Sequence, residues 1–292
     1  MTGQRGSSFP GAGGVEIFWR AWLPDGAPEA VVVIAHGAGE HSGRYEHVAQ
    51  RLVAERYAVY AIEHRGHGRS QGPRALIDRI DNAVADLDEL VRLAAGAHPG
   101  APVFLLGHSM GGTIAVRYAL AHQRRLSGLV LSGPLAALQA PPAPMRVAAR
   151  LLSAVAPRAP LIAIDSTQVS RDPAVVRDYQ QDPLVHHGKL PARTVVELAD
   201  AIDAFPQSVG TITLPTLIMY GTDDGLCPPE GSVMLAERIG SATLKSYPGL
   251  YHEILNEPER EQVLDDLCSW LAARVAQPAG AVTPSENRQP LK

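Results

Sequence analysis

Cysteines, long apolar runs and clusters of basic residues are scarce in this sequence, and each absence excludes a class of protein. Only Cys227 and Cys268 occur, without a CxxC pair, so we expect neither a metal cluster nor a disulfide framework. No apolar run reaches the roughly eighteen residues of a transmembrane helix. The net charge is −4 and basic residues are scattered, so a nucleic-acid-binding protein is not expected.

The two ends of the chain are polar. Met1 to Gly14 lacks the apolar stretch of a signal peptide, so a cytoplasmic protein is the default expectation. Residues 277–292 are rich in proline, glycine and polar side chains and are predicted to be a disordered tail. Because 46% of the residues are hydrophobic, the chain between these ends can bury a sizeable core.

Short apolar runs alternate along the chain with segments of helical periodicity. The runs predict strands at Ala30–Ala35, Ala58–Ile62, Val103–Leu106, Leu129–Leu131, Thr216–Tyr220 and Thr243–Tyr247. The helical patterns predict helices at Arg44–Arg56, Asp81–Ala97, Met110–His122, Pro229–Ile239 and Pro258–Val275. Val15–Leu23 alternates in polarity and is predicted to be an antiparallel edge strand. This alternation favours an α/β fold with a mostly parallel central sheet flanked by helices.

One segment interrupts the alternation of strands and helices. Residues 135–213 are helical and Pro-rich in pattern, without a convincing strand, and they follow Leu129–Leu131. We expect them to form a helical cap, inserted after the sixth core strand, over the sheet edge where open α/β folds bind ligands. Residues 1–134 and 214–276 are then expected to form the core.

Gly107-His108-Ser109-Met110-Gly111 matches the G-x-S-x-G pattern of a nucleophile elbow. A buried-strand pattern precedes it and a helical pattern follows, which is the context that such an elbow requires. Both glycines are expected because side chains there would collide with neighbouring backbone. The alternative is a Gly-rich turn with a helix-capping serine. The context favours Ser109 as the nucleophile of an α/β-hydrolase.

A serine hydroxyl is a poor nucleophile near neutral pH and needs a general base within hydrogen-bond reach. In α/β-hydrolases the acid and then the histidine follow the serine along the chain. Asp223 and Asp224 come after the strand Thr216–Tyr220, and His252 lies in a loop before the last helix. We favour Asp224 as the acid that orients His252, because Asp223 can cap its own turn.

A tetrahedral intermediate of acyl transfer needs N–H donors for its oxyanion. The expected donors are the backbone amides of Met110, directly after the nucleophile, and Ala38, in the loop after the strand Ala30–Ala35. The alternative for this loop is an ordinary Gly-rich turn. Chemistry of this kind needs no metal ion and no cofactor, and none is expected.

Several motifs together resemble the monoacylglycerol lipases, especially bacterial, actinobacterial members. They are HGAGEHSGRY at 36–45, HRGHGRS at 64–70, GHSMGG at 107–112 and GTDD at 221–224, and the likeness extends over about residues 10–275. The resemblance implies hydrolysis of a small lipid, a monoacylglycerol, to glycerol and a fatty acid without a cofactor. It assigns Ser109, Asp224 and His252 to the catalytic triad. It assigns Ala38 and Met110 to the oxyanion hole.

The resemblance also implies a site for the glycerol end of the substrate. Glu40 and Arg44 match positions that hold glycerol in mammalian relatives. A histidine joins them in those relatives, and Leu255 stands at its position here. The contacts to glycerol are therefore expected to differ in this chain.

A predicted cap helix at Met145–Val155 carries an apolar stripe at helical spacing. Arg146 and Arg150, one turn apart, are placed to extend toward lipid phosphate groups. The hypothesis is that this helix makes peripheral contact with a membrane or lipid surface and admits an acyl chain. The alternative is that the stripe only packs on the core.

Other functions would use the same elbow. A broader carboxylesterase or lysophospholipase would share the triad and differ in its pocket. A serine aminopeptidase would need acidic cap residues to hold a substrate ammonium, and the candidates are Asp165, Glu197, Asp200 and Asp203. A non-catalytic binding protein would be favoured by a missing triad residue, but all three candidates are present. Cys227 is either a reactive thiol or, more commonly for a cysteine, a buried one.

Overall fold

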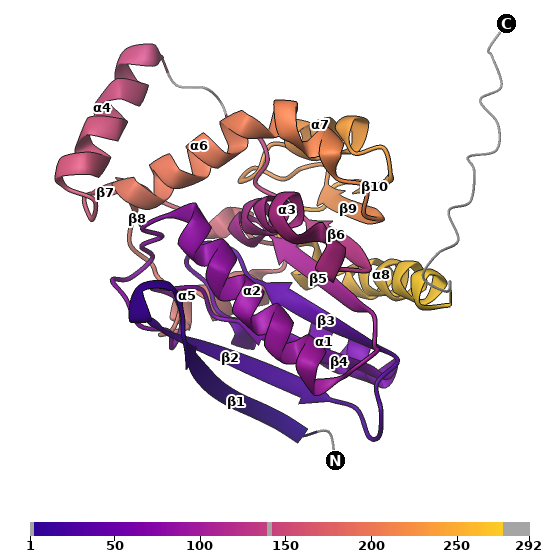
Figure 1. Ribbon diagram of the computed structural model, residues 1–292. Helices are drawn as coiled ribbons and strands as arrows, with labels where there is room; N and C mark the ends of the chain where they lie inside the picture. The colour runs from indigo at the N-terminus through magenta and orange to yellow at the C-terminus, as the bar shows by residue number, and fades with distance from the viewer. Residues whose placement is uncertain (1–2, 139–141, 277–292) are drawn as a thin grey trace, which may run out of the picture.

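An eight-stranded sheet forms the centre of the molecule (Figure 1). The computed structural model describes residues 3–138 and 142–276. In spatial order the strands are β1 (Gly3–Pro10), β2 (Glu16–Leu23), β4 (Tyr57–Ile62), β3 (Ala30–Ala35), β5 (Val103–His108), β6 (Gly128–Ser132), β9 (Thr216–Gly221) and β10 (Ala242–Tyr247). The pairs β1–β2 and β2–β4 are antiparallel and the other pairs are parallel. The predicted mostly parallel sheet is confirmed.

Helices cover both faces of this sheet, because its central strands are apolar on both sides. One face carries α2 (Ile80–Ala97), α3 (Met110–His122) and α7 (Pro229–Arg238), and the other carries α1 (Glu46–Ala54) and α8 (Arg260–Val275). Successive residues of β3 point to opposite faces, so Val31 and Val33 join the first core while Val32 and Ile34 join the second. Burial on both faces explains why these strands are continuous apolar runs.

The structure differs from the predicted strands in two places. Val15–Leu23 was predicted at the edge, but β1 lies outside it and pairs with it along its length. No apolar alternation marks β1, because among residues 5–10 only Phe9 is buried. The absence of strands predicted for 135–213 is also wrong, since β7 (Pro160–Ile162) and β8 (Leu190–Pro191) form a small antiparallel sheet there. These strands are too short to leave a periodic pattern.

The segment between β6 and β9, which we call the cap, also contains three helices. They are α4 (Ala143–Val155), α5 (Pro173–Gln181) and α6 (Ala192–Ser208). Residues of the cap share a cavity with Ser109, which directly follows β5, so the cap lies over the carboxyl ends of the parallel strands. Helical cap insertions of this kind enclose the ligand-binding edge of an open α/β sheet.

Buried hydrogen bonds tie the α5–α6 part of the cap to the core. The Thr194 hydroxyl of α6 donates to the Ala75 carbonyl at 2.7 Å and accepts the Ile77 amide at 2.9 Å. The Asp182 carboxylate after α5 lies 2.8 Å from the His41 ring nitrogen. Because several of these groups are buried, separating the α5–α6 part from the core would leave polar atoms without partners.

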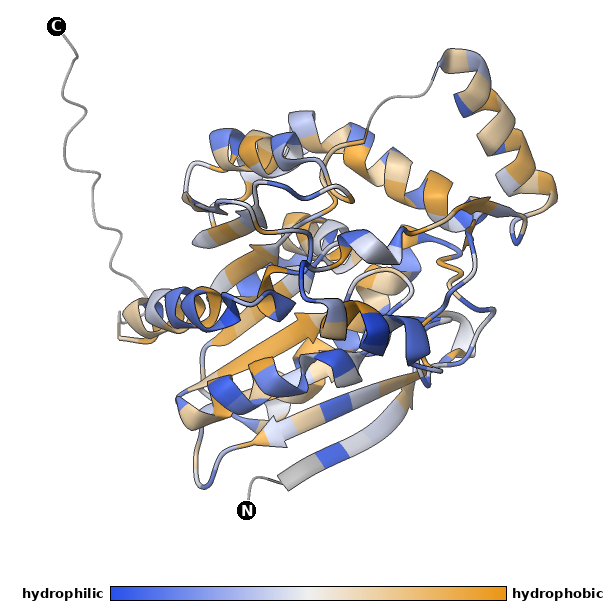
Figure 2. Cartoon of the chain, turned by 180° about the vertical axis from the view of Figure 1, so that it is seen from behind, coloured by the Kyte–Doolittle hydropathy of each residue, from blue (hydrophilic) through white to orange (hydrophobic). Residues whose placement is uncertain are grey.

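Helix α4 is attached much more loosely. Only Ser153 is buried in this helix, while Met145, Val147, Leu151 and Val155 are exposed. Figures 1 and 2 show α4 at the margin of the molecule, packed beside α6 and away from the central sheet. The apolar stripe predicted from the sequence is therefore largely exposed rather than packed on the core.

Two remaining predictions concern the membrane and the C-terminal tail. Within residues 3–138 and 142–276, no helix is long and apolar enough to cross a membrane. The predicted tail, 277–292, lies outside the described residues. The domain limits at 134/135 and 213/214 stay predictions.

Candidate active site

Ser109 lies on a tight turn between β5 and α3. Its φ of 53° and ψ of −121° are strained for a residue with a side chain. A Cβ at Gly107 would lie 2.5 Å from the Gly111 carbonyl oxygen, and one at Gly111 would lie 2.1 Å from the Ala35 carbonyl oxygen. Only glycine fits at either position, so the close packing of Gly107 against α3 and of Gly111 against β3 explains the G-x-S-x-G pattern.

Asp224 and His252 lie in loops after β9 and β10 and are joined by a hydrogen bond. His252 Nδ1 is 2.8 Å from Asp224 Oδ2, and both side chains are buried. Asp224 Oδ1 accepts the backbone amides of Leu226 and Cys227, which fixes the carboxylate. Asp223 is exposed and hydrogen-bonds a neighbouring threonine. The structure therefore brings Asp224, and not Asp223, to the histidine.

The surroundings of His252 favour its charged form. Burial disfavours the charge, but the Cys227 sulfur and the Asp224 carboxylate raise the pKa of His252 well above its usual value. A carboxylate that accepts a hydrogen bond from Nδ1–H leaves Nε2 as the nitrogen that can take a proton from a hydroxyl. The pair therefore has the geometry of a general base and the acid that orients it.

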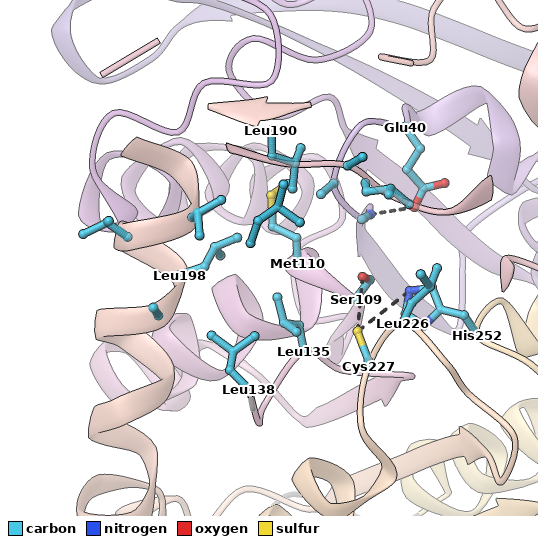
Figure 3. A pocket seen from close by; sticks show the side chains of 18 of the residues that line it. Glu40, Ser109, Met110, Leu135, Leu138, Leu190, Leu198, Leu226, Cys227 and His252 are labelled. Carbon is cyan, nitrogen blue, oxygen red and sulfur yellow. Dashed lines mark hydrogen bonds between the residues drawn. The ribbon is translucent and has the colours of Figure 1, made fainter. Parts of the chain in front are cut away.

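The Cys227 thiol lies between the Ser109 hydroxyl and the His252 ring (Figure 3). Its Sγ is 3.7 Å from Ser109 Oγ and 4.0 Å from His252 Nε2. In the described chain Ser109 and His252 share no hydrogen bond, so proton transfer between them requires a movement that brings Oγ within reach of Nε2. Cys227 is buried, and its position beside the serine is a contact that the sequence pattern did not reveal.

The amides expected to form an oxyanion hole both border the cavity beside Ser109. Ala38 and Met110 line this cavity, and Met110 is the first residue of α3, where helix N–H groups lack intrahelical partners. Within the described residues neither amide donates a hydrogen bond to the protein, whereas the neighbouring Gly37 amide donates to Glu40 Oε1 at 2.6 Å. Two available donors beside the serine can stabilise an oxyanion.

A cavity of about 420 Å³ extends from Ser109 beneath the cap (Figure 3). At one end, here called the catalytic end, lie Glu40, Ser109, His252 and Glu253. The opposite end, here called the cap end, is lined by apolar side chains that include Leu138, Val195 and Leu198. Figure 3 shows Leu138 and Leu198 on the far side of the cavity from Glu40 and His252. The shape suits a ligand with a long apolar part and a polar reactive end.

Glu40 and Arg44 meet at the catalytic end, together with a third residue, Glu253, that sequence reasoning missed. Arg44 Nη1 is 2.8 Å from Glu40 Oε2 and 2.6 Å from Glu253 Oε1, and Nη2 is 2.7 Å from Glu253 Oε2. Burial opposes the charge of Glu40, but Arg44 and nearby histidines lower the pKa of its carboxyl to about 2. Sequence reasoning gave Glu253 no role, although it directly follows His252 in the chain.

Two predicted glycerol-end positions lie outside the cavity lining. Leu255 packs in the hydrophobic core, and its carbonyl accepts a hydrogen bond from His47 Nε2 at 2.8 Å. Arg44 lies behind the two carboxylates rather than on the cavity wall. Of Glu40, Arg44, Glu253 and Leu255, the two that line the cavity are therefore Glu40 and Glu253.

Two ion pairs join α4 to α6 of the cap. Arg146 Nη2 is 3.0 Å from Asp203 and Arg150 Nη2 is 2.5 Å from Asp200, so α4 is linked to α6 on the cavity wall. The two arginines therefore point toward α6, whereas the sequence analysis expected them to extend toward lipid phosphate groups. The two other acidic candidates for an ammonium site, Asp165 and Glu197, accept backbone amides. All four acids are thus already engaged, which argues against an aminopeptidase site.

The fold and the site together define the class of protein. A mostly parallel sheet carries a strained serine after β5, and a hydrogen-bonded His–Asp pair lies in the loops after β9 and β10. In the described residues no group of three or more His, Cys, Asp or Glu side chains is arranged to hold a metal ion. The strained serine and the His–Asp pair at this edge of the sheet are features of a serine hydrolase with the α/β-hydrolase fold.

Comparisons with known proteins narrow the class. The family model described as "Serine aminopeptidase, S33" matches residues 26–259. A monoacylglycerol lipase of Mycolicibacterium smegmatis is 46% identical over 92% of this chain and 97% of its own length. The Homo sapiens monoglyceride lipase is 37% identical over 94% of this chain and 92% of its own length. The crystal structure of Paleococcus ferrophilus monoacylglycerol lipase has a TM-score of 0.80 at 31% identity, covering 89% of this chain and 99% of that one. The chain belongs to the monoacylglycerol lipase family, which confirms the resemblance found in its motifs.

Proposed function

We propose that this protein hydrolyses monoacylglycerols to glycerol and a free fatty acid, with Ser109 as nucleophile, His252 as general base and Asp224 as its orienting acid. The observation that carries the proposal is the Asp224–His252 hydrogen bond beside the Ser109 elbow, at one end of a mostly apolar cavity. The substrate class is supported by the names of the relatives that are 46% and 37% identical.

The reaction proceeds through an acyl-enzyme. A movement of Ser109 brings Oγ within reach of His252 Nε2, which takes its proton while Oγ attacks the ester carbonyl carbon. The oxyanion accepts hydrogen bonds from the amides of Ala38 and Met110. Collapse of this intermediate breaks the ester bond, and glycerol leaves with the proton from His252. Water then gives a proton to His252, attacks the acyl-enzyme and releases the fatty acid, and Ser109 regains its proton.

The cavity orients the substrate in this mechanism. The acyl chain occupies the cap end, where apolar side chains remove it from water. The glycerol lies at the catalytic end against Glu40, which lines the cavity. Arg44 acts from behind by fixing the Glu40 carboxylate at 2.8 Å. Both residues thus contribute to substrate binding, but only Glu40 makes direct contact.

The exposed stripe of α4 is the part of the molecule that contacts a lipid surface when substrate is taken up. The side chains of Leu151 and Val155 are 63% and 81% exposed, and they lie on a helix that borders the cavity. Burying such side chains in a bilayer interface is favourable by about 25 cal/mol per Å². Because Arg146 and Arg150 pair with α6, we expect this binding to depend on apolar burial and only weakly on salt.

The surface contact is tested with the double variant Leu151→Ser/Val155→Ser. Its binding to neutral phosphatidylcholine vesicles, measured by co-sedimentation, should fall by about tenfold or more, because two large apolar contacts are lost. The matched control is Leu244→Ser, an exposed leucine on β10, which should bind like the wild type. Unchanged binding by the double variant would remove the lipid-surface role and leave the catalytic proposal intact.

The substrate class is tested by fatty-acid release from monoacyl-, diacyl- and triacylglycerols and lysophosphatidylcholine, with aminoacyl amides assayed in parallel. We expect rapid hydrolysis of monoacylglycerols and slow hydrolysis of the larger lipids, because the cavity is enclosed beneath the cap. Equal rates on all esters would reduce the function to a general carboxylesterase. Cleavage of the amides alone would overturn the proposal in favour of a peptidase.

A further inference from the structure

Two carboxylates lie side by side at the catalytic end of the cavity and take no part in the bond-making steps above. Arg44 Nη1 donates to both Glu40 Oε2 and Glu253 Oε1, at 2.8 and 2.6 Å. Because one nitrogen atom holds both oxygens, these two oxygens are neighbours. Two acidic groups are thus brought together at one end of a largely apolar cavity.

The two carboxylate oxygens that accept hydrogen bonds from Arg44 Nη1 can each accept one more. Glu40 Oε1 already accepts the Gly37 amide and the Tyr45 hydroxyl. Glu253 Oε2 already accepts Arg44 Nη2 and the side-chain amide of Asn256. Within the described chain, Glu40 Oε2 and Glu253 Oε1 each accept only from Arg44 Nη1. A carboxylate oxygen can accept two hydrogen bonds, so each can take one more donor.

Both carboxylates are placed to meet the alcohol part of a substrate. Glu40 and Glu253 line the cavity, and each is almost fully buried. A methyl group at Gly37 would lie 2.9 Å from the Glu40 carboxylate and 3.0 Å from Ser109 Cβ, so Glu40 and Ser109 flank the same glycine. Glu253 directly follows His252 in the chain. An ester held at Ser109 therefore has its leaving alcohol close to Glu40, and the shared Arg44 nitrogen places the Glu253 carboxylate beside that of Glu40.

The charges at this end of the cavity do not cancel. Glu40 and Glu253 carry two negative charges and Arg44 carries one positive charge, and the guanidinium is behind the acids rather than on the cavity wall. The described cations that do line the cavity, Arg146 and Arg150, are on α4 and are each paired with an aspartate. An anionic alcohol part would meet acceptors of like charge in a poorly solvated site, which is unfavourable.

We propose that Glu253, paired with Glu40, is a specificity-determining residue that accepts substrate hydroxyl groups and discriminates against acyl donors whose alcohol part is anionic. When a group that cannot donate a hydrogen bond replaces a substrate hydroxyl, the buried acceptors of such a site lose their hydrogen-bond partners. The inference rests on the proposed function, because it concerns the alcohol part of the same ester substrate. It adds to that function a preference for neutral polyol esters over their phosphorylated counterparts.

A purely structural role for Glu253 makes a different prediction. The Glu253 amide donates to the Val169 carbonyl of the cap at 2.8 Å, and this backbone contact does not depend on the side chain. If the carboxylate only held Arg44 in place, its loss would change the rates on all esters by the same factor. A specificity role changes the ratio between esters that differ in the charge of the alcohol part.

The test compares 1-monooleoylglycerol with 1-oleoylglycerol 3-phosphate, which share an acyl chain and differ by one phosphate. Both are assayed in neutral detergent micelles with the wild type and with Glu253→Gln, which has the same shape without the charge. Rates on p-nitrophenyl butyrate, which has no glycerol, correct for damage to the triad. We expect the ratio of kcat/KM values for the neutral over the anionic ester to fall by about tenfold in Glu253→Gln, since about one charge interaction is removed.

Two further variants keep the result interpretable. Glu261→Gln, an exposed residue of α8, makes the same change in net charge and should leave the ratio unchanged. Glu253→Asp keeps the charge and should retain most of the preference, even if Glu253→Gln folds poorly. A ratio within about twofold of wild type in Glu253→Gln would overturn the inference alone. No hydrolysis of 1-monooleoylglycerol by the wild type would overturn the proposed function, and this inference with it.

Discussion

The two ends of the cavity are built in different ways. At the catalytic end, Asp224, His252, Glu40 and Glu253 are buried and hydrogen-bonded to groups of the core. At the cap end, α4 has a single buried residue and is linked to α6 by exposed ion pairs, a type of contact that contributes little to stability. The core therefore holds the reacting groups rigidly, whereas α4, unlike the α5–α6 part of the cap, can change at little cost in stability.

Among the residues that support the nucleophile, the largest expected effect is loss of the acid that orients His252. Asp224→Asn should lower kcat by about 10³- to 10⁴-fold, because the amide favours the wrong tautomer of the imidazole. The matched control is Asp223→Asn, which changes an exposed neighbour and should alter kcat by less than about threefold. Steady-state hydrolysis of a monoacylglycerol measures both. A large effect of Asp223→Asn with a small effect of Asp224→Asn would reverse the assignment of the acid.

The second expected effect is a loss of stability when the tightly packed elbow is given an extra methyl group. Gly111→Ala would place a Cβ 2.1 Å from the Ala35 carbonyl, and we expect the free energy of unfolding to fall by about 3 kcal/mol or more. Gly96→Ala on α2 meets no atom within 4 Å and should raise that free energy by about 0.5 kcal/mol, because alanine favours a helix. Urea unfolding measures both. Equal stability of Gly111→Ala and wild type would show that the elbow is not tightly packed.

The third effect is a loss of stability in mild acid, caused by buried histidines beneath the catalytic end. Burial lowers the pKa of His36, His64, His67 and His108, that of His67 to about 3. The unfolded chain binds these protons near pH 6.5 and the folded chain does not, so the stability that these groups provide is present above pH 6.5 and decreases as the pH falls below it. His252, whose pKa is raised, acts in the opposite direction.

The balance of these histidines gives a measurable prediction. Burial also lowers the pKa values of His47 and His98, so six lowered values stand against one raised value, and the free energy of unfolding should fall by about 2 kcal/mol or more between pH 7 and pH 6. Urea titrations at the two pH values, at constant ionic strength, measure the difference. A free energy of unfolding that stays constant or rises toward pH 6 would contradict the burial of neutral histidines in this region.

The smallest expected effect lies at the cap end. Leu151→Ser on α4 should change the free energy of unfolding by no more than about 0.5 kcal/mol, because the side chain is exposed. Thermal or urea unfolding provides the measurement. A loss above about 1.5 kcal/mol would show that the α4 stripe is packed on another part of the molecule and would remove the contrast between the two ends.

The arrangement of Ser109, Asp224 and His252 around the elbow could be predicted from the sequence because its signals are local. Glycines at 107 and 111 are required by backbone contacts, and the order of serine, acid and histidine follows the order of the strands. The sequence could also choose Asp224 over Asp223, although both follow the same strand. Local backbone geometry and chain order are recorded in short motifs, so they can be read without the tertiary structure.

The rest of the site depends on contacts between segments that are distant in sequence. Arg44 meets Glu253 across 209 residues, and Cys227 lies between Ser109 and His252 with no motif to mark it. Helical periodicity showed the α4 stripe but not whether it faced the core or solvent, nor that Arg146 pairs with α6. Strand β1 lacks an apolar pattern because only Phe9 among residues 5–10 is buried. Such features follow from packing rather than from local sequence.

The proximity of Cys227 to Ser109 makes the identity of the nucleophile the most direct test of this account. The measurement is kcat on a monoacylglycerol for Ser109→Ala and Cys227→Ala, each checked for folding by circular dichroism. We predict that Ser109→Ala lowers kcat by at least about 10⁴-fold, while Cys227→Ala retains kcat to within about tenfold. Loss of activity in Cys227→Ala with activity retained in Ser109→Ala would contradict the assignment of Ser109 as the nucleophile.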